Sequence, residues 1–432
     1  MKFIVHPGGP LRGAARVPGD KSVSHRAVML GALATGRTIV HECLVGEDVL
    51  ATIAAMRALG VQIERDVGEV RIDGCGGRFD PGPLRLDLGN SGTSMRLVAG
   101  LIAGRGVAAD LVGDASLMRR PMERVAAPLR AMGADVVCGG EDGRPPVTIR
   151  PVAALTPIDY RLPVASAQVK SAILLAGLAA RGSTKVHEPA PTRDHSERML
   201  RAFGVEVRTS GGEVSLTGPA ELVGTELTVP GDVSSAAFFL VAGSICPGSE
   251  IALENVGLNP TRTGVIEILE AMGARIEITA QRTFGGEPVA DVAVRYAPLS
   301  GIEIPPHTVP NAIDEFPALF IAAACAKGTT VLRGARELRF KESDRIAAMA
   351  EGLEALGIRC ETFEDGIAIE GGRMGGGSVV AHGDHRIAMS FAVAGVAASG
   401  PVSIGDCAAV ATSFPGFAEL ARSLGMAIEV EA

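Results

Sequence analysis

The chain of 432 residues has no tryptophan and only two tyrosines, and aromatic residues make up 3% of it. Proteins that hold single-stranded nucleic acids usually stack the bases on aromatic rings, so this shortage argues against such a partner. The formal charge of −8 at pH 7 also argues against a general polyanion-binding surface. Any site for a small anion must therefore be a local group of cations.

Long apolar runs are missing as well. The start, MKFIVHPGGPLRG, lacks the apolar core of a signal peptide, and stretches such as AILLAGLAA at 172–180 are too short to span a bilayer. The seven cysteines contain no CxxC pair, and their odd number suits a reducing compartment. We therefore expect a cytoplasmic protein with no nucleic-acid partner and no membrane partner.

What the chain does have is an internal repeat of about 70 residues. An amphipathic run that ends in Leu-Gly, Met-Gly or Phe-Gly, followed by a strand pattern, occurs six times, with its glycine at Gly60, Gly133, Gly204, Gly273, Gly357 and Gly425. Glycine is expected just past the end of a helix because that position often needs a positive φ. These runs alternate with six Ala-rich stretches that begin near Ser22, Ser91, Ser166, Ser234, Asp314 and Asp384. Since these stretches are apolar on nearly all sides, we expect six buried helices.

The length and the repeat together predict two large domains of three repeats each. The tetrapeptide Val-Pro-Gly-Asp occurs at 17–20 and again at 229–232, and we interpret the two copies as crossings between domains. The prediction is an α/β (α+β) fold with an N-terminal domain at 19–231 and a discontinuous C-terminal domain at 1–18 plus 232–432. An open solenoid with a binding face is the alternative for such a repeat.

Polar motifs gather where the six buried helices should begin, in GDKSVSHR, GNSGTSMR, ASAQVKS, GDVSSA, AIDEF and GDHR. A helix N-terminus presents unpaired N–H groups and a partial positive charge, so it favours anions, although ordinary N-capping explains any single Ser or Asp. Basic residues lie in or beside these motifs: Lys21, Arg26, Arg96, Arg120, Arg193, Lys341, Arg345 and Arg386. The combination predicts a site for small molecules that carry several negative charges.

Other kinds of site fit less well. GDKS at 19–22 is similar to part of a nucleotide-binding loop, but the upstream glycine spacing is wrong. His382 and His385 could ligate a metal, yet no further cluster supports them, so we expect no metal and no cofactor. In contrast, Asp314 and the segment KESDR at 341–345 place carboxylates and an ammonium near the expected anions, as proton transfer requires. A solvated first helical turn is the alternative for KESDR.

Eight motifs in order make the chain resemble the 5-enolpyruvylshikimate-3-phosphate (EPSP) synthase family of enolpyruvyl transferases. They are GDKSVSHR (19–26), LGNSGTSMR (88–96), RRPM (119–122), ASAQVKSA (165–172), TRDHSERML (192–200), IDE (313–315), KESDR (341–345) and GDHRIAM (383–389). The resemblance covers essentially the whole chain. It implies two domains, each of three βαβαββ repeats about a pseudo-threefold axis, with the active site in the interdomain cleft.

The resemblance also implies a reaction. The enolpyruvyl group of phosphoenolpyruvate would be transferred to the 5-hydroxyl of shikimate 3-phosphate, with release of phosphate, by addition and elimination through a tetrahedral intermediate. This is a step of aromatic amino acid biosynthesis by the shikimate pathway. Domain closure is expected to complete the site, and the chain is expected to act as a monomer.

The residues implied by the resemblance fall into three groups. The catalytic group is Asp314, Glu342, Lys21 and Lys341, with Asp314 as the base and Glu342, assisted by Lys341, as the proton donor. Shikimate 3-phosphate would be bound by Lys21, Ser22, Arg26, Ser166, Ala167, Gln168, Arg193, Asp314 and Lys341. Phosphoenolpyruvate would be bound by Lys21, Gly92, Arg120, Gln168, Arg345, His385 and Arg386. Gly92 stands where a larger side chain is linked to tolerance of the herbicide glyphosate in the family.

Two alternatives remain open at this point. The sister enzyme that transfers enolpyruvate to UDP-N-acetylglucosamine has the same fold but uses a loop cysteine near the position of Arg120, and the stretch GDASLMRRPM at 113–122 contains none. The second alternative is a non-catalytic scaffold that kept the fold.

Overall fold

The computed structural model describes residues 1–431, which form two compact units. Unit 1 contains residues 1–18, residues 230–283 and the chain from residue 288 onward. Unit 2 contains residues 19–229 and the short segment 284–287. The chain therefore passes between the units four times, after Pro18, Val229, Thr283 and Glu287.

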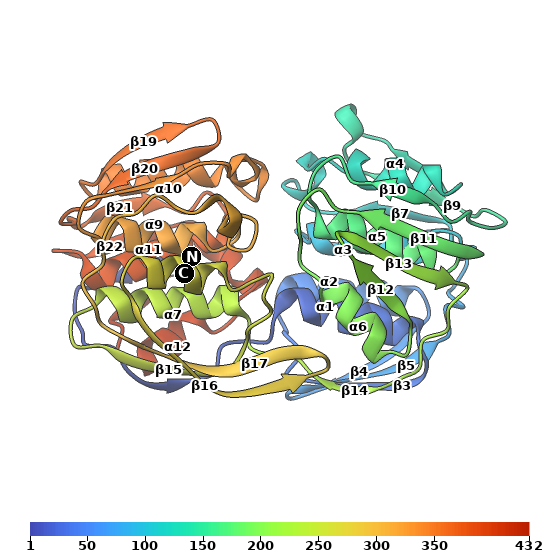
Figure 1. Cartoon of the computed structure of the whole chain (residues 1–432), viewed down its shortest axis with the longest axis horizontal. Coiled ribbons are helices and arrows are strands. Elements are labelled where there is room, and N and C mark those ends of the chain that lie inside the picture. Colours follow the sequence, from blue (N-terminus) through green and yellow to red (C-terminus); the bar gives the residue numbers. More distant parts are fainter. Residues whose placement is uncertain (432) are drawn as a thin grey trace. The chain divides into compact units, whose positions relative to one another are not determined.

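Unit 2 is built from three βαβαββ repeats, each with a four-stranded sheet in the described residues (Figure 1). The first repeat comprises β14 (Glu226–Thr228), α1 (Lys21–Leu33), β3 (Thr35–His41), α2 (Glu47–Ala58), β4 (Gln62–Asp66) and β5 (Glu69–Cys75). The second comprises β6 (Leu84–Asp87), α3 (Gly92–Ile102), β7 (Ala109–Val112), α4 (Glu123–Ala131), β8 (Asp135–Cys138) and β9 (Val147–Arg150). The third comprises β10 (Asp159–Arg161), α5 (Ala167–Gly177), β11 (Gly182–His187), α6 (His195–Ala202), β12 (Val207–Ser210) and β13 (Glu213–Gly218).

Unit 1 follows the same plan. Its first repeat comprises β2 (Arg12–Ala15), α7 (Val233–Ile245), β15 (Glu250–Gly257), α8 (Gly264–Ala271), β16 (Arg275–Phe284) and β17 (Glu287–Arg295). The second comprises α9 (Phe316–Cys325), β18 (Thr329–Leu332), α10 (Arg345–Ala355), β19 (Arg359–Phe363) and β20 (Gly366–Glu370). The third comprises β21 (Gly377–Val380), α11 (His385–Ala397), β22 (Val402–Gly405), α12 (Phe417–Ser423), β23 (Ile428–Glu431) and β1 (Lys2–Val5). Short 3₁₀ helices lie at Leu117–Arg119, Glu141–Gly143, Pro306–Thr308, Arg336–Phe340 and Ala408–Thr412.

The strand order is the same in five of the six repeats of the described residues. The sheet β18-β20-β19 has three strands, and isolated parallel bridges from Ser300 to Lys327 and from Glu303 to Val331 take the place of the first strand. In the second repeat the order is β6-β7-β9-β8, with β6 and β7 parallel and the other pairs antiparallel. The first repeat of each unit obtains its first strand from elsewhere in the chain, because β14 pairs with β3 and β2 pairs with β15, both in parallel. The last sheet is completed by β1, which lies antiparallel between β22 and β23.

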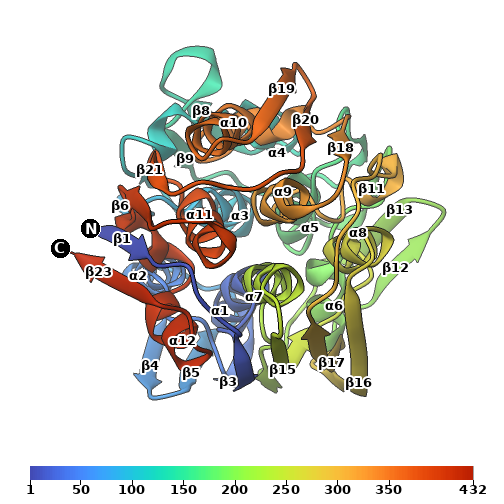
Figure 2. The ribbon, with the colours of Figure 1, turned by 90° about the vertical axis from the view of Figure 1, so that its left-hand side faces the viewer.

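The six predicted buried helices are present and start within two residues of the predicted positions. They are α1, α3, α5, α7, α9 and α11. In unit 1, α7, α9 and α11 pack against one another, with the sheets around them (Figure 2). Every residue of α7 is buried, as its largely apolar sequence predicts. Within the described part of the chain, no helix is long and apolar enough to cross a membrane.

The other helix of each repeat ends as predicted. The six glycines that follow α2, α4, α6, α8, α10 and α12 all have positive φ, between 84° and 101°. A residue with a Cβ rarely adopts this positive φ, so glycine ends the helix and turns the chain into the next strand.

Candidate active site

Asp314 lies within a group of charged side chains in unit 1. It directly precedes Glu315, the N-cap residue of α9, so the start of a buried helix determines its place. Lys341 Nζ lies 3.2 Å from Asp314 Oδ1, and Arg345 Nη1 lies 3.4 Å from the same oxygen. Three of the predicted site residues are thus brought together, with a carboxylate held between two cations.

Arg345, the first residue of α10, links this group to two further carboxylates. Its side chain is 1% exposed, and it donates to Asp384 Oδ2 at 2.8 Å and to Glu342 Oε2 at 2.7 Å. Burial alone would lower the pKa of Arg345, but the carboxylates of Asp384, Glu342 and Asp314 outweigh it and raise the pKa. The guanidinium therefore stays charged and fixes the three acids around it.

The segment KESDR is not a solvated helical turn. Helix α10 begins only at Arg345, and Lys341, Glu342 and Ser343 precede it in a half-buried loop. Asp344 is the N-cap residue, with Oδ1 accepting from the Ala347 backbone N–H at 3.0 Å. From this loop, Lys341 reaches Asp314 and Glu342 reaches Arg345. Consecutive residues of a regular helix do not face the same side, so a helical turn would not allow both contacts.

The start of α11 contributes the next charges. Asp384 caps the helix by accepting from the backbone N–H of Arg386 at 2.9 Å, and it also accepts from Ser343 Oγ at 3.1 Å. His385 and Arg386 are both buried. Within residues 1–431 no hydrogen bond or ion pair engages the Arg386 guanidinium. Burial of an uncompensated cation is unfavourable, so this position favours an anionic ligand.

A second buried network fixes Glu315, the neighbour of Asp314 in the chain. Arg262 Nη2 donates to Ser234 Oγ at 2.5 Å and lies 3.4 Å from Glu315 Oε1 and 3.3 Å from Asp232 Oδ1. Ser234 in turn donates to Glu315. The three charged side chains of this network are almost completely buried. It joins the starts of α7 and α9 and thereby supports the backbone at Asp314.

In unit 2, Lys21 and Ser22 form the first turn of α1. Lys21 Nζ lies 3.1 Å from Asp48 Oδ2, and Asp48 is a buried residue in the first turn of α2. The ammonium group is therefore oriented by one carboxylate and remains partly exposed. The side chain of Ser22 is half-buried beside it.

Arg26 lies one turn further along α1 and holds three segments together. Its Nε donates to Ser196 Oγ at 2.7 Å, Nη2 donates to Ser171 Oγ at 2.9 Å, and Nη1 donates to the carbonyl of Ser22 at 3.0 Å. Burial lowers the pKa of Arg26 to about 10, so it is still charged at neutral pH. The predicted substrate contact is thus a buried arginine that also positions α5 and α6.

Gln168 is oriented by a buried arginine of α3. Arg96 Nη1 donates to Gln168 Oε1 at 2.7 Å, and Gln168 Nε2 donates to Thr93 Oγ1 at 3.0 Å. Gly92, the first residue of α3, lies against the same guanidinium: a Cβ there would lie 2.9 Å from Arg96 Nη1 and 3.0 Å from Arg120 Nη1. The structure therefore brings Gly92, Arg120 and Gln168 together.

Arg120 is placed by a side chain from the loop before α3. Its Nη2 donates to Asn90 Oδ1 at 2.6 Å, and Asn90 Nδ2 donates to Asp114 Oδ2 at 2.7 Å. Arg120 itself follows the 3₁₀ helix Leu117–Arg119, which ends where Arg120 adopts an extended backbone. The guanidinium thus has a neutral partner at this contact rather than a carboxylate.

Ser166, Ala167 and Arg193 lie at two helix starts of the third repeat. Ser166 Oγ caps α5 by accepting from the Val169 backbone N–H at 3.4 Å, and Ala167 is the first residue of that helix. The capping interpretation is therefore correct for Ser166, and a capped helix N-terminus still favours an anion because its other first N–H groups have no partner within the helix. Arg193 lies two residues before α6, in a half-buried segment.

Several residues that fix these side chains were not among the predicted site residues. They are Asp48, Asn90, Thr93, Arg96, Ser171, Ser196, Arg262 and Asp384. Asn90, Thr93 and Arg96 belong to the quoted motif LGNSGTSMR, so closer attention to that motif would have found them. Ser171 belongs to ASAQVKSA, whereas Asp48 and Arg262 lie outside the quoted motifs and only the packing reveals them. In residues 1–431 no group of three or more His, Cys, Asp or Glu side chains is arranged to hold a metal ion.

Comparisons with known proteins show the family of this chain. The family model of EPSP synthase, described as 3-phosphoshikimate 1-carboxyvinyltransferase, matches residues 5–420. The chain belongs to the EPSP synthase family. It is an enzyme, a transferase of the shikimate pathway of aromatic amino acid biosynthesis.

Individual relatives support the family over the full length. The chain is 61% identical to the 3-phosphoshikimate 1-carboxyvinyltransferase of Acidithiobacillus ferrooxidans and 59% identical to that of Methylococcus capsulatus, with 99% of this chain covered in both cases and 99% and 98% of the relatives. The solved structure of the EPSP synthase of Acinetobacter baumannii superposes with a TM-score of 0.90 at 54% identity, covering 100% of both chains. The predicted two-domain fold is confirmed, and the UDP-N-acetylglucosamine enzyme and the scaffold are not favoured.

Proposed function

We propose that this chain transfers the enolpyruvyl group of phosphoenolpyruvate to the 5-hydroxyl of shikimate 3-phosphate through Asp314. The observation that supports this role best is the placement of the Asp314 carboxylate 3.2 Å from the Lys341 ammonium, next to Arg345 and one ion pair away from Glu342. A base held beside an acid and two cations suits a reaction that takes a proton from an alcohol and gives one to a carbon.

Shikimate 3-phosphate is bound mainly by helix starts of unit 2 in this proposal. Lys21, with its partly exposed ammonium, and the first N–H groups of α5 suit the phosphate. Arg193, two residues before α6, adds a further cation. Asp314 and Lys341 of unit 1 take the 5-hydroxyl end. The full proposed set is Lys21, Ser22, Arg26, Ser166, Ala167, Gln168, Arg193, Asp314 and Lys341.

Phosphoenolpyruvate is bound by Lys21, Gly92, Arg120, Gln168, Arg345, His385 and Arg386. The buried, unengaged guanidinium of Arg386 supports this assignment most directly. Arg345 contributes less, because its carboxylate contacts already use four of its five N–H groups. We therefore assign to Arg345 mainly the task of holding Asp314 and Glu342, with one N–H left for the substrate.

The chemistry proceeds by addition and then elimination. Asp314 takes the proton of the 5-hydroxyl while the hydroxyl oxygen forms a bond to C2 of phosphoenolpyruvate. The π electrons of the double bond take a proton at C3 from Glu342, which must enter this step as the carboxylic acid. In the tetrahedral intermediate the C2–O bond to phosphate then breaks, C3 returns a proton to Glu342, and the double bond reforms. Asp314 passes its proton to the departing phosphate, whose charge is stabilised by Lys21, Arg120 and Arg386.

This mechanism requires groups from both units to reach the same two substrates. We propose that the two units act as domains with the boundaries predicted above, 19–231 and 1–18 plus 232–432, and that closure upon binding excludes water. The proposal includes a monomer in the cytoplasm. Light scattering of the purified chain tests the monomer, and a scattering profile that does not contract with both ligands would contradict closure.

Release of inorganic phosphate is the direct test of the function. We expect phosphate to appear only when phosphoenolpyruvate and shikimate 3-phosphate are both present, because addition must precede elimination. Replacing shikimate 3-phosphate by UDP-N-acetylglucosamine should give no release. Release with the nucleotide sugar would support the sister activity, and no release with either acceptor would support a scaffold.

The contact at Gly92 gives a specific prediction for phosphoenolpyruvate. The new methyl group of Gly92→Ala must displace the guanidinium ends of Arg96 and Arg120, so we expect the KM for phosphoenolpyruvate to rise about tenfold. Inhibition by glyphosate should weaken in the same variant. Steady-state kinetics measure both, and Gly8→Ala is a suitable control because a Cβ at Gly8 meets nothing within 4 Å. An unchanged KM in Gly92→Ala would remove Arg120 from the site.

A further inference from the structure

The hairpin of β16 and β17 is divided between the two units. Its strands belong to the sheet β16-β17-β15-β2 of unit 1, but its turn, Phe284–Glu287, groups with unit 2. Gly285 and Gly286 in this turn both have positive φ, which lets the chain reverse direction within two residues. The turn thus supplies four residues to a unit that is otherwise a continuous stretch of chain.

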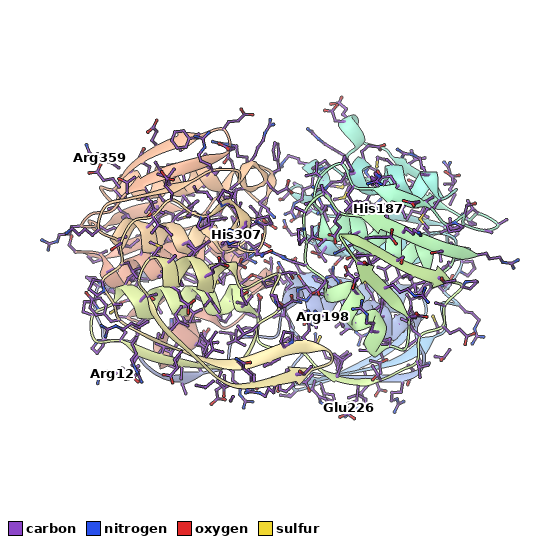
Figure 3. The ribbon with its side chains drawn as sticks, in the orientation of Figure 1. Arg12, His187, Arg198, Glu226, His307 and Arg359 are labelled. Carbon is purple, nitrogen blue, oxygen red and sulfur yellow. The ribbon has the colours of Figure 1, made fainter. Side chains whose placement is uncertain are left out.

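The turn is fastened to the start of α6 by two contacts. Glu287 Oε1 lies 2.8 Å from His195 Nδ1, and both side chains are 3% exposed. The carbonyl of Gly286 accepts from Arg198 Nη1 at 3.0 Å, and Arg198 is labelled on α6 in Figure 3. A carboxylate only accepts hydrogen bonds, so Nδ1 of His195 carries a proton towards Glu287.

These contacts reach the residues that follow Arg193 directly. Asp194, the N-cap residue of α6, accepts from Arg198 Nε through both carboxylate oxygens at 2.8 and 2.9 Å. Arg198 thus joins Asp194 to the hairpin turn, and Glu287 joins His195 to the same turn. The backbone on the C-terminal side of Arg193 is therefore fixed by a segment that comes from the sheet of unit 1.

The same helix turn also reaches Arg26. Ser196, the residue after His195, accepts from Arg26 Nε at 2.7 Å, and Glu287 lies close enough to Arg26 to act on it electrostatically. If Glu287 only held the hairpin turn in place, an apolar pair of similar volume would do so without the free-energy cost of removing a carboxylate from water. Glu287 contacts His195, which lies two residues after Arg193, and it acts electrostatically on Arg26, so its position suggests a role in arranging these two arginines.

We propose that Glu287 is a positioning residue for shikimate 3-phosphate, which acts by fixing the start of α6 so that Arg193 and Arg26 face the phosphate together. This inference rests on the proposed function and adds to it a residue outside all the sequence motifs. It also makes the hairpin turn a part of the acceptor site, although the turn lies in the second half of the chain. Neither Arg193 nor Arg26 is assigned to phosphoenolpyruvate, so its binding should not depend on Glu287.

The test is a comparison of variants in equilibrium binding of shikimate 3-phosphate and in steady-state kinetics. Glu287→Ala removes the acceptor for His195, and we expect the Kd and the KM for shikimate 3-phosphate to rise about tenfold or more. The KM for phosphoenolpyruvate and the kcat at saturation should stay within about twofold, which a general loss of structure would not allow. Glu287→Gln keeps an oxygen that can accept from His195 and should recover most of the affinity.

Two further variants keep the inference falsifiable. Arg198→Met releases the carbonyl of Gly286 without touching Glu287 and should weaken shikimate 3-phosphate binding in the same direction, so it carries the test if Glu287→Ala does not fold. Glu250→Ala is the matched control, because Glu250 is an exposed acid of the same sheet, paired with Arg295.

The outcomes separate the two proposals. If the unchanged chain does not bind shikimate 3-phosphate, the proposed function fails and this inference fails with it. If the unchanged chain binds and both Glu287→Ala and Arg198→Met bind equally well, only this inference is overturned. A parallel loss of phosphoenolpyruvate affinity and of kcat in the variants would also overturn it, because the effect would then not be confined to the acceptor.

Discussion

Replacing Asp314 by asparagine is expected to lower kcat by about 10²–10⁴-fold, the usual contribution of a general base. Asparagine keeps the size of the side chain and can still accept a hydrogen bond from Lys341, but it cannot take the proton of the 5-hydroxyl. The KM for phosphoenolpyruvate should change little, since Asp314 is not assigned to that substrate. Steady-state and single-turnover phosphate release measure the effect.

The control for this variant is an aspartate that has only a surface role. Asp66 is paired with Arg71 at 2.7 Å and its side chain is 64% exposed, so Asp66→Asn should leave kcat unchanged. A kcat for Asp314→Asn within tenfold of the unchanged chain would show that another group takes the proton.

Replacing Arg345 by methionine is expected to destabilise the protein by about 3–5 kcal/mol, because it leaves buried carboxylates without their cation. Asp384 is completely buried and loses its bonds from Arg345 Nε and Nη2, while Glu342 and Asp314 each lose one contact. The matched control is Arg359→Met, because Arg359 is paired with Glu370 on the surface and is 81% exposed. We expect the control to change the free energy of unfolding by less than about 0.5 kcal/mol.

The pH dependence of the Arg345 variant follows from Asp384. Burial alone would raise the pKa of Asp384, but the charge of Arg345 outweighs it and holds the pKa below its ordinary value. In the unchanged chain this carboxylate therefore adds stability above its unfolded-state pKa, and the contribution is lost as the pH falls through the lower folded-state pKa. Without Arg345 the pKa of Asp384 should rise instead, so that its buried charge destabilises the variant at neutral pH.

Urea unfolding at several pH values tests this sign. The difference in free energy of unfolding between the unchanged chain and Arg345→Met should be largest near pH 7 and should shrink as the pH falls and Asp384 of the variant takes up a proton. A difference that stays constant with pH would mean that Arg345 acts through packing rather than through the charge of Asp384.

Local patterns were sufficient to predict the elements that frame the site. The glycines at the six helix ends adopt the positive φ that their position suggested, and the six apolar stretches are buried helices with Ser, Asp or Glu at the N-cap. These features depend on residues within one turn of each other, so a single sequence contains them. KESDR was more difficult, because its charges suited both a helical turn and a loop.

Residues that act through others could not be predicted in the same way. Arg26 was identified from its motif, but its contacts to Ser171 and Ser196 depend on how α1, α5 and α6 pack. Arg262 and Glu287 lie outside every motif, and each becomes significant only because its charge is buried against residues far away in the sequence.

The sequence by itself determined the repeat, the buried helices, the charged residues at their starts and the resemblance that led to the family. Only the tertiary structure decided which strands complete which sheets, as with β1, β2 and β14, and which acid meets which base, as with Asp314 between Lys341 and Arg345. The physical reason is that helix ends and amphipathic patterns result from short-range sterics and hydrogen bonding, which each segment carries with it. Ion pairs and strand pairs between distant segments exist only after the cores have packed.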